Sequence, residues 1–283
     1  MRVPATSANL GPGYDCLGLA LALYDEVTAS ITDGPGGVEV SGEGAGSLPV
    51  DESHVVVASL RSAFRICGHS APSVNVRCRN VIPQARGMGS SSAAIVAGVV
   101  LARHLMGPDS MDDADVLEVA ADLEGHPDNV APCVLGGFTI AWLDDRGVAR
   151  AVRRDPVPGL TPVVYVPEVR GLTASARAAL PGRVPHADAA FNVGRAALAV
   201  HAFTSDASLL CEATEDRLHQ RYRGASMPES AALVGRLRSA GVAAMVSGAG
   251  PSVLAFPSAP PEAAGFQVRA LPVGRGAHRV GAP

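Results

Sequence analysis

At residues 83–94 the chain reads Pro83-Gln84-Ala85-Arg86-Gly87-Met88-Gly89-Ser90-Ser91-Ser92-Ala93-Ala94, a run with two glycines, three hydroxyls and the start of an apolar segment. Gly87 and Gly89 allow the backbone to turn with positive φ and to approach a ligand closely, and the serines suit a helix N-cap. A helix over roughly Ser91 to Leu105 would direct its first N–H groups at an anion. We therefore predict a phosphate-binding loop, although a serine-capped helix after a glycine turn needs no ligand.

This loop differs from a Walker loop, which needs a lysine after its last glycine to reach the terminal phosphates. The chain contains no lysine, and all 23 of its basic residues are arginine. A nucleotide kinase built on this loop must therefore take positive charge from backbone dipoles, a metal ion and arginine. The candidate phosphate-binding residues are Pro83, Arg86, Gly87, Met88, Gly89, Ser90, Ser91 and Ser92.

Length and composition indicate a folded protein without nucleic-acid partners. The 283 residues suffice for one large or two ordinary domains. Hydrophobic residues make up 47% of the chain and aromatic residues only 4%, so we expect a core of Val, Leu and Ala. The net charge is −4, and no basic run is present, which disfavours nucleic-acid binding.

The five cysteines are scattered and show no C-x-x-C spacing. This pattern favours reduced core residues of a cytoplasmic protein over a disulfide framework. The first residues lack a basic segment followed by an apolar one, and no apolar run approaches the ~20 residues of a membrane span. We expect a cytoplasmic protein with no membrane partner.

Hydrophobic periodicity predicts alternating strands and helices, which place the fold in the α+β or α/β class. Strands are predicted at 2–3, at 38–40 within a hairpin, and at 74–78, 138–143, 163–166, 242–246 and 253–256. Helices are predicted at 52–67, 91–105, 112–124, 173–180, 186–203 and 228–240. Residues 124–132 are expected to be irregular, and the tail from Pro257 is expected to cover a sheet edge. A domain boundary is predicted near residue 155, because 146–160 carries Gly, Pro and Arg without periodicity.

Two other turn-rich stretches lie far from the loop in sequence. The first, Pro4-Ala5-Thr6-Ser7-Ala8-Asn9-Leu10-Gly11-Pro12-Gly13-Tyr14-Asp15, precedes an apolar run and is a position where a site is common. The second, Ser247-Gly248-Ala249-Gly250-Pro251-Ser252, separates two predicted strands. A glycine turn between strands would have a similar sequence without any function.

The order and separation of 4–15, 83–94 and 246–252 resemble the three motifs of the GHMP small-molecule kinase superfamily. The first of these, with Glu124-Gly125-His126-Pro127-Asp128-Asn129-Val130-Ala131-Pro132, resembles its homoserine kinase branch. The resemblance implies a two-domain α+β fold, with a ribosomal-S5-like domain at 1–155 that carries the ATP-binding loop and a ferredoxin-like domain at 156–283. It also implies transfer of the γ-phosphoryl group of ATP to the side-chain hydroxyl of L-homoserine, a step of threonine biosynthesis.

The resemblance further implies a Mg²⁺ site at Ser91 and Glu118, which offer the hard oxygen ligands that this ion prefers. Helical spacing alone favours another interpretation of Glu118, because Asp115 and Asp122 suggest a solvated polar face. The third motif would support the nucleotide loop and the substrate pocket. Its residues are Ser247, Gly248, Ala249 and Gly250.

For the substrate, the resemblance implies that Asp15 holds the ammonium near the hydroxyl, with Asn9 and Asn129 beside it. Arg177 and Arg223 would hold the carboxylate, because a guanidinium fork matches this planar anion. A simple surface position is the alternative for both arginines, in a chain whose only long basic side chain is arginine.

The identity of a catalytic base is open. Asn129 stands where mevalonate-kinase-like relatives carry an Asp, and an amide cannot accept the proton. The catalytic candidates are Asp15, Asn129 and Thr173. We expect stabilisation of a loose transition state by the loop, Mg²⁺ and Thr173 to dominate. His126 is expected to be structural.

The chain departs from the family pattern at Tyr14, where Phe is common, and at His54, where Asn is often found near the adenine. Two alternative functions remain: a GHMP-type kinase for a mevalonate-like or cytidylyl-methylerythritol alcohol, and a non-catalytic ligand sensor. Asn129 and Arg177 disfavour the first, and the retained loop glycines, Ser91 and Glu118 disfavour the second. The oligomeric state is open, with a homodimer as one alternative.

Overall fold

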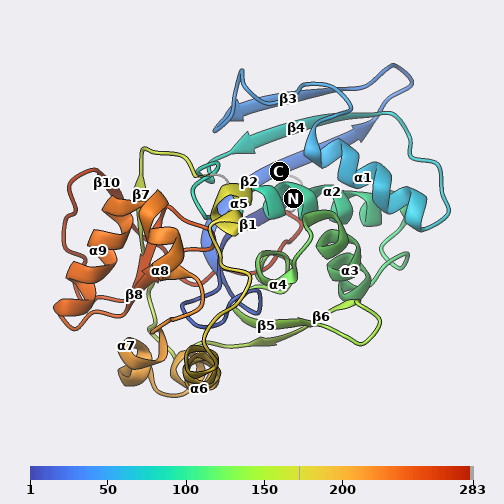
Figure 1. Ribbon diagram of the computed structural model, residues 1–283. Helices are drawn as coiled ribbons and strands as arrows, with labels where there is room; N and C mark the ends of the chain where they lie inside the picture. Colours follow the sequence, from blue (N-terminus) through green and yellow to red (C-terminus); the bar gives the residue numbers. More distant parts are fainter. Residues whose placement is uncertain (172, 281–283) are drawn as a thin grey trace.

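The protein folds around two β-sheets, as described by a computed structural model over residues 1–171 and 173–280. The first sheet has six strands in the order β3-β4-β2-β5-β6, and β1 pairs with β2. The second has four strands in the order β10-β7-β9-β8. Figure 1 shows the two sheets next to each other, with the first on the right and the second on the left.

All strand pairs are antiparallel except β3 with β4, which is parallel. The strands of the first sheet are β1 (Arg2–Ala8), β2 (Leu17–Ile31), β3 (Gly37–Gly42), β4 (Val74–Asn80), β5 (Phe138–Leu143) and β6 (Ala149–Arg154). Those of the second are β7 (Val163–Pro167), β8 (Ala244–Val246), β9 (Val253–Ala255) and β10 (Phe266–Ala270).

Two predictions about the first sheet were wrong. Strand β1 does not end at Val3 but continues to Ala8, with Ser7 opposite Leu19. The predicted hairpin around 38–40 does not form, because β4 occupies the neighbouring edge of β2, with Ile31 opposite Val74. Strand β3 therefore pairs with the far side of β4.

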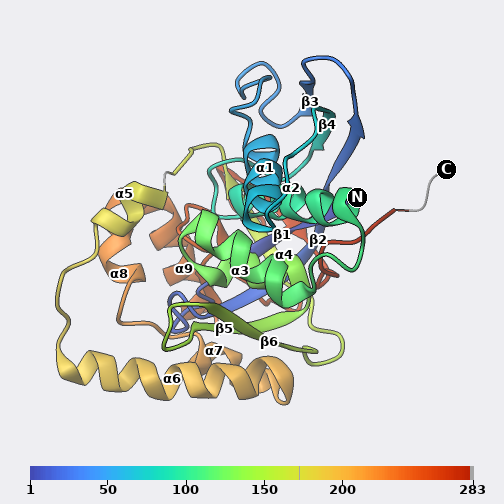
Figure 2. The same cartoon turned by 90° about the vertical axis from the view of Figure 1, so that its right-hand side faces the viewer.

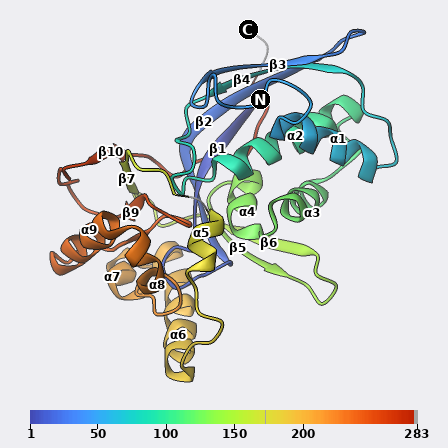
Figure 3. The same cartoon turned by 45° about the horizontal axis from the view of Figure 1, so that its top comes forward.

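Four helices pack against the first sheet from one side, as Figures 1 and 3 show. These are α1 (Val55–Ile66), α2 (Ser90–Met106), α3 (Asp113–Glu124) and α4 (Pro127–Leu135). The helices of the second half are α5 (Thr173–Ala178), α6 (His186–Thr204), α7 (Leu210–Ala213), α8 (Gln220–Arg223) and α9 (Pro228–Ser239). In Figure 2 the long α6 runs below β5 and β6.

The expectation of an irregular segment at 124–132 was wrong from Pro127 onward, because these residues form most of α4. Pro127 occupies the first helical position, where its missing N–H costs nothing. Pro132 lies inside the helix and cannot donate to the Asp128 carbonyl. That carbonyl packs against Gly18 of β2, where an added Cβ would come within 2.2 Å of it.

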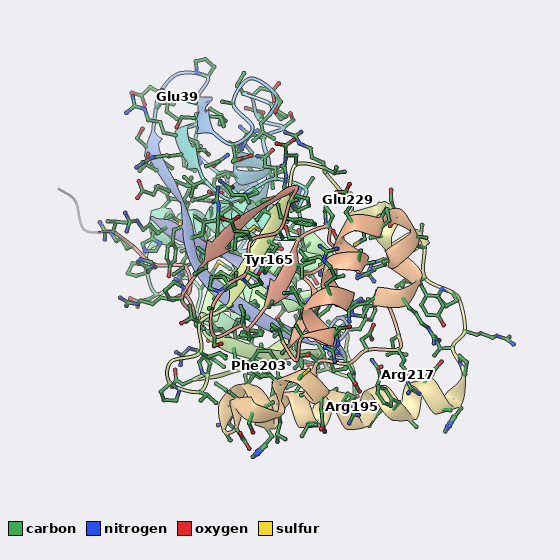
Figure 4. The ribbon with its side chains drawn as sticks, turned by 90° about the vertical axis from the view of Figure 1, so that its left-hand side faces the viewer. Glu39, Tyr165, Arg195, Phe203, Arg217 and Glu229 are labelled. Carbon is green, nitrogen blue, oxygen red and sulfur yellow. The ribbon has the colours of Figure 1, made fainter. Side chains whose placement is uncertain are left out.

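The two halves share an apolar core. Phe203 of α6 stacks on Phe138 of β5 with ring centroids 5.1 Å apart, and it meets Phe256 edge to face at 5.5 Å. Figure 4 shows Phe203 between the second sheet and α6. The same figure labels Arg195 and Arg217 near α6, and their guanidinium carbons lie 4.7 and 3.7 Å from the centroid of the Phe191 ring.

The C-terminal tail returns to the first sheet. Arg2 and His278 exchange backbone hydrogen bonds of 2.9 and 3.0 Å, and Gly274 N donates to Ala20 O at 2.8 Å. The expectation that the tail covers a sheet edge is therefore confirmed at β1. The chain passes from the first sheet to the second between Arg154 and Val163. A domain boundary at residue 155 stays a prediction.

The five cysteines are unpaired, with Cys78 and Cys133 buried and Cys16, Cys67 and Cys211 half-buried. Across residues 1–171 and 173–280, no helix is both long enough and apolar enough to span a membrane.

Candidate active site

The loop of 83–89 leads directly into α2. This helix begins at Ser90, and its N-cap is Gly89, with φ of 68°, so the serines occupy the first helical turn instead of the predicted N-cap. Their hydroxyls are directed elsewhere: Ser91 Oγ and Ser92 Oγ donate to the Glu124 carboxylate at 2.9 and 2.8 Å. Among the described residues no side chain caps α2, which leaves its first N–H groups for an anion.

The two loop glycines are required by packing within the protein. A Cβ at Gly89 would lie 1.9 Å from Thr6 Oγ1, and one at Gly87 would lie 2.2 Å from Ser247 O. Both residues have positive φ. The sequence predicts that the two glycines let the backbone approach a ligand. In the structure they let it approach β1 and the third motif. A contact with phosphate stays a prediction.

The loop of 9–15 holds Asp15 in a defined place. Asn9, Leu10 and Asp15 have φ of 67°, 45° and 54°, a region that is costly for residues with a Cβ and common at functional sites. The Asn9 side chain donates to Gly248 O at 2.9 Å and accepts from Asp15 N at 3.0 Å. Asn9 thus positions Asp15, and its amide is already engaged at both ends.

Asp15 and Arg177 form a bidentate ion pair between the two halves, with N–O distances of 3.0 and 3.1 Å. The hydrogen bond to Asp15 is the main reason why the pKa of Arg177 is raised above its usual value. The side chains of Arg177 and Asp15 are 45% and 34% exposed, respectively, and ion pairs at such sites contribute little stability. A ligand that satisfies both charges can therefore replace this pair at small cost.

Arg223 is only 3% exposed. Its Nε donates to Ala176 O at 3.2 Å and its Nη1 to Gly248 O at 3.3 Å. Burial lowers the pKa of Arg223 from its usual value, but a guanidinium stays charged at neutral pH. In the part of the chain that the structure describes, no carboxylate forms a salt bridge with it. A buried cation without a carboxylate is suited to bind an anion.

Asn129 lies in the first turn of α4, where Thr6 Oγ1 donates to its Oδ1 at 2.9 Å. Its Nδ2 is not engaged by this bond and can donate a hydrogen bond. At the start of the same helix, His126 Nδ1 lies 2.6 Å from Asp128 Oδ1, and Asp128 is buried. The hydrogen bond to Asp128 is the main reason why the pKa of His126 is raised. This pairing supports a structural function for His126.

Arg86 connects the loop to the second half of the chain. Its guanidinium donates to the backbone oxygens of Pro167 and Glu168, both at 2.8 Å, and of Gln84 at 3.1 Å. The predicted contact of Arg86 with phosphate would have to be made by its remaining N–H groups, because these three bonds hold the loop in place.

The third motif joins the other two. Ser247 Oγ donates to Gly87 O at 2.6 Å and lies 2.9 Å from Ser7 Oγ, and Gly248 N donates to Ala8 O at 3.1 Å. These contacts link the loop of 83–89 with the end of β1. In this structure the third motif therefore has an architectural function.

Most of the predicted site residues meet in one small cavity between the two halves. Those that line it are Asn9, Asp15, Arg86, Gly87, Gly89, Ser90, Ser91, Asn129, Arg177, Arg223 and Ala249. Among the described lining residues there is no Glu118, which lies half-buried on α3 and stays a predicted ligand. The side chain of Thr173 and all of Leu172 lie outside the described residues.

Several residues at the site were not predicted from the sequence, among them Glu124, Asp128 and Thr6. Glu124 faces Ser91 and Ser92, although its place in the motif of 124–132 gave no sign of this contact. Thr6 contacts both Gly89 and Asn129, so β1 positions two of the motifs at once. The pairing of β1 with β2 places Thr6 next to Gly89 and Asn129, which lie far from it in the sequence.

The oxygen ligands next to the start of α2 suit a magnesium ion that also binds phosphate. Within residues 1–171 and 173–280, no group of three or more His, Cys, Asp or Glu side chains could hold a metal. Mg²⁺ is usually bound by one or two carboxylates together with phosphate oxygens and water. The Ser91 hydroxyl and the Glu124 carboxylate provide such a partial set of ligands.

Two family models match the chain. The model of the GHMP kinases N terminal domain matches residues 54–137, and that of the GHMP kinases C terminal matches residues 196–272. The chain therefore belongs to the GHMP kinases, whose fold it has. The resemblance seen in the motifs is confirmed.

Similarity to individual proteins is concentrated in one branch of this family. The homoserine kinase of Streptomyces coelicolor is 54% identical, over 92% of this chain and 84% of that protein. The homoserine kinase of Cutibacterium acnes is 47% identical over 98% and 97%. The crystal structure of homoserine kinase from Cytophaga hutchinsonii superposes with a TM-score of 0.84 at 26% identity, over 97% and 94% of the two chains. Within the GHMP kinases, the chain belongs to the homoserine kinases.

Proposed function

We propose that this chain transfers the γ-phosphoryl group of ATP to the side-chain hydroxyl of L-homoserine and so forms O-phospho-L-homoserine for threonine biosynthesis. One observation carries the proposal. An acid, Asp15, and two guanidinium groups, Arg177 and Arg223, share a cavity with the uncapped start of α2. This set complements an α-amino acid that lies beside a phosphate chain.

The substrate takes the place of an internal ion pair. Its ammonium binds Asp15, and its carboxylate binds Arg177 and Arg223. The ammonium thus replaces Arg177 as the partner of Asp15, and the carboxylate replaces Asp15 as the partner of Arg177. A ligand with only one of the two charges leaves an arginine or a carboxylate unpaired and binds less well.

The nucleotide phosphates bind at the start of α2, where Ser90 and the following residues offer backbone N–H groups. A second cavity, next to the loop, is lined by Leu48, His54, Ser90 and Ala94 among others, and it offers room for the purine base. His54 Nδ1 accepts a hydrogen bond from Val56 N at 3.3 Å and so caps α1. His54 lines this cavity, so a bound base would lie next to its ring.

Ser91 and a carboxylate of α3 would hold the Mg²⁺ ion. Glu118 is the family-derived candidate, and the hydrogen bonds of Glu124 to Ser91 and Ser92 support Glu124 as a second one. The bound ion would neutralise charge on the transferred phosphoryl group.

The transfer itself asks the chain mainly for orientation. Because Thr6 occupies its oxygen, Asn129 is available to donate from Nδ2 and orient the substrate hydroxyl. Asp15, which lines the cavity, is a candidate to accept the proton late in the reaction, and a loose transition state needs no strong base before transfer. Thr173 stays a predicted stabiliser of that state.

The proposed compartment is the cytoplasm, where five unpaired thiols stay reduced. Assembly into a homodimer stays a prediction.

Coupled release of ADP from purified protein tests the proposal. With MgATP, we expect turnover with L-homoserine and none with mevalonate or L-threonine. Turnover with mevalonate instead would assign another GHMP-type activity. Absence of turnover with all three, together with measurable ATP binding, would favour a ligand sensor.

A further inference from the structure

A fully buried histidine, His219, lies between the loop that carries Asp15 and the guanidinium of Arg223. Its Nε2 is 2.7 Å from Gly11 O, and its Nδ1 is 3.1 Å from Arg223 Nη1. The side chain is 0% exposed. His219 is thus in contact with both sides of the predicted amino-acid site without lining the cavity itself.

The two partners define the state of this ring. A carbonyl oxygen can only accept a hydrogen bond, and a guanidinium can only donate. The ring is therefore neutral, with Nε2–H donating to Gly11 and Nδ1 accepting from Arg223. Burial lowers the pKa of His219 from its usual value, Asp216 opposes this effect, and Arg223 adds to it.

The loop of 9–15 is also attached to the second half by contacts with Thr214, with Asn192 of α6 and with the His219 ring. An added Cβ at Gly11, whose φ is 81°, would lie 2.5 Å from Thr214 O. Asn192 Nδ2 donates to Pro12 O at 3.2 Å. The Tyr14 ring lies 5.4 Å from the His219 ring. The position of Asp15 therefore depends on the segment that holds His219 and Arg223.

We propose that His219 is a positioning residue that fixes the Arg223 guanidinium relative to the Asp15 loop and so sets the selectivity for an α-amino acid head group. This inference rests on the proposed function. An ammonium and a carboxylate on one carbon require an acid and a guanidinium at a matching separation. The His219 side chain fixes this separation, because it bonds both to the Gly11 carbonyl of the loop that carries Asp15 and to Nη1 of Arg223.

The substitution His219→Leu removes the acceptor for Arg223 and the donor to Gly11 while it preserves an apolar side chain. We expect the KM for L-homoserine to rise about tenfold, equivalent to about 1.4 kcal/mol. The KM for ATP and kcat should change much less. 3-Aminopropan-1-ol, which is homoserine without its carboxylate, should show no comparable loss. The preference of the enzyme for homoserine over this amino alcohol should therefore fall about tenfold.

A double-mutant cycle tests whether His219 acts through Arg223. In Arg223→Ala, the further change His219→Leu should have little additional effect on the KM for homoserine, because the group that it positions is gone. His278→Leu is the matched control, since the half-buried His278 also bonds to a backbone carbonyl, that of Gly276 at 2.8 Å, but belongs to the C-terminal tail beside Arg2. Its homoserine preference should equal that of the wild type.

If His219→Leu fails to fold, two conservative variants test whether the contact of Nδ1 with Arg223 sets the homoserine preference. Asn places an oxygen near the position of Nδ1, so His219→Asn should retain most of the homoserine preference. Gln reaches the position of Nε2, so His219→Gln should retain less. The reverse order, an equal loss for both substrates, or additive effects with Arg223→Ala would overturn the inference. Failure of the wild type to phosphorylate homoserine would instead refute the proposed function.

Discussion

At the scale of single residues, the site balances its charges internally. Asp15 and Arg177 neutralise each other through two hydrogen bonds, whereas the buried Arg223 has, among the described residues, carbonyl, imidazole and Tyr14 ring partners but no carboxylate. A zwitterion can exchange with the first pair and can also supply the anion that Arg223 lacks. In the proposed function, the site would select a ligand that carries both charges, because each charge of such a ligand has a partner already in place.

The substitution Arg177→Ala should raise the KM for homoserine roughly 10- to 150-fold, because a charge-assisted hydrogen bond contributes about 1.5–3 kcal/mol. The KM for ATP should be nearly unchanged. Arg269→Ala is the matched control, since Arg269 is a half-buried arginine of β10 whose side chain, among the described residues, bonds to Gln267. Steady-state kinetics of ADP release measures both variants. Equal values for the two variants would mean that Arg177 is a surface arginine without a function in binding.

Glu124→Gln tests the carboxylate that faces the loop serines. We expect the Mg²⁺ concentration for half-maximal activity to rise about tenfold, equivalent to about 1.4 kcal/mol, because the neutral amide is a poorer ligand. Glu118→Gln, measured alongside, shows which of the two candidate ligands on α3, Glu118 or Glu124, binds Mg²⁺. If only the Glu118 variant changed its Mg²⁺ dependence, the family-derived assignment would hold and Glu124 would serve only to bind the serine hydroxyls.

At the scale of elements, the geometry of the site depends on how strands and helices end. Helix α2 and strand β5 could be predicted from the sequence nearly to their bounds, because their apolar patterns are long or continuous. Helix α4 could not, because a proline usually breaks a helix and the sequence gives no sign that the carbonyl left free by Pro132 packs against Gly18. Strand β10 was missed because its position depends on pairing with β7.

Strand β2 also positions the start of the loop through a buried carboxylate. Asp25 accepts hydrogen bonds from Val81 N at 2.6 Å and Ile82 N at 2.9 Å. Burial raises the pKa of Asp25 from 3.8 to about 6, although these two bonds oppose the shift. The native state therefore binds this proton more tightly than the unfolded chain does.

It follows that Asp25 lowers the free energy of unfolding as the pH rises from about 4 to about 6, with the full loss present above that range. Asp25→Asn retains an oxygen for the two N–H groups and removes the titration. We expect this variant to lack that part of the pH dependence and to be more stable at pH 7, by at most about 3 kcal/mol. Urea denaturation at several pH values measures the difference. Identical pH profiles for variant and wild type would contradict the assignment.

At the scale of the whole molecule, the site exists because the two halves are held together. The aromatic stack of Phe138 and Phe203, the bonds of Arg86 to Pro167 and Glu168, and the returning tail all cross between them. The motifs and most of the site residues could be predicted from the sequence through their resemblance to a family. The bonds of Thr6, Glu124 and His219 could not, because they join segments that only the folded chain brings together.

The substitution Phe203→Ala tests the shared core. Loss of a fully buried aromatic side chain should lower the free energy of unfolding by about 3–5 kcal/mol. Because Phe203 contacts both Phe138 and Phe256, we expect one cooperative transition at a lower temperature, as measured by calorimetry. Two separated transitions in the wild type would show instead that the halves unfold independently.

In the proposed function, one cavity binds both the ammonium and the carboxylate of an α-amino acid beside the nucleotide phosphates. This binding is tested most directly by comparing kcat/KM with MgATP for L-homoserine, for 3-aminopropan-1-ol, which lacks the carboxylate, and for 4-hydroxybutyrate, which lacks the ammonium. We predict that each deletion lowers kcat/KM by at least about tenfold, since each leaves a charged partner unpaired. Equal values for homoserine and either analogue would contradict the proposed binding of both charges.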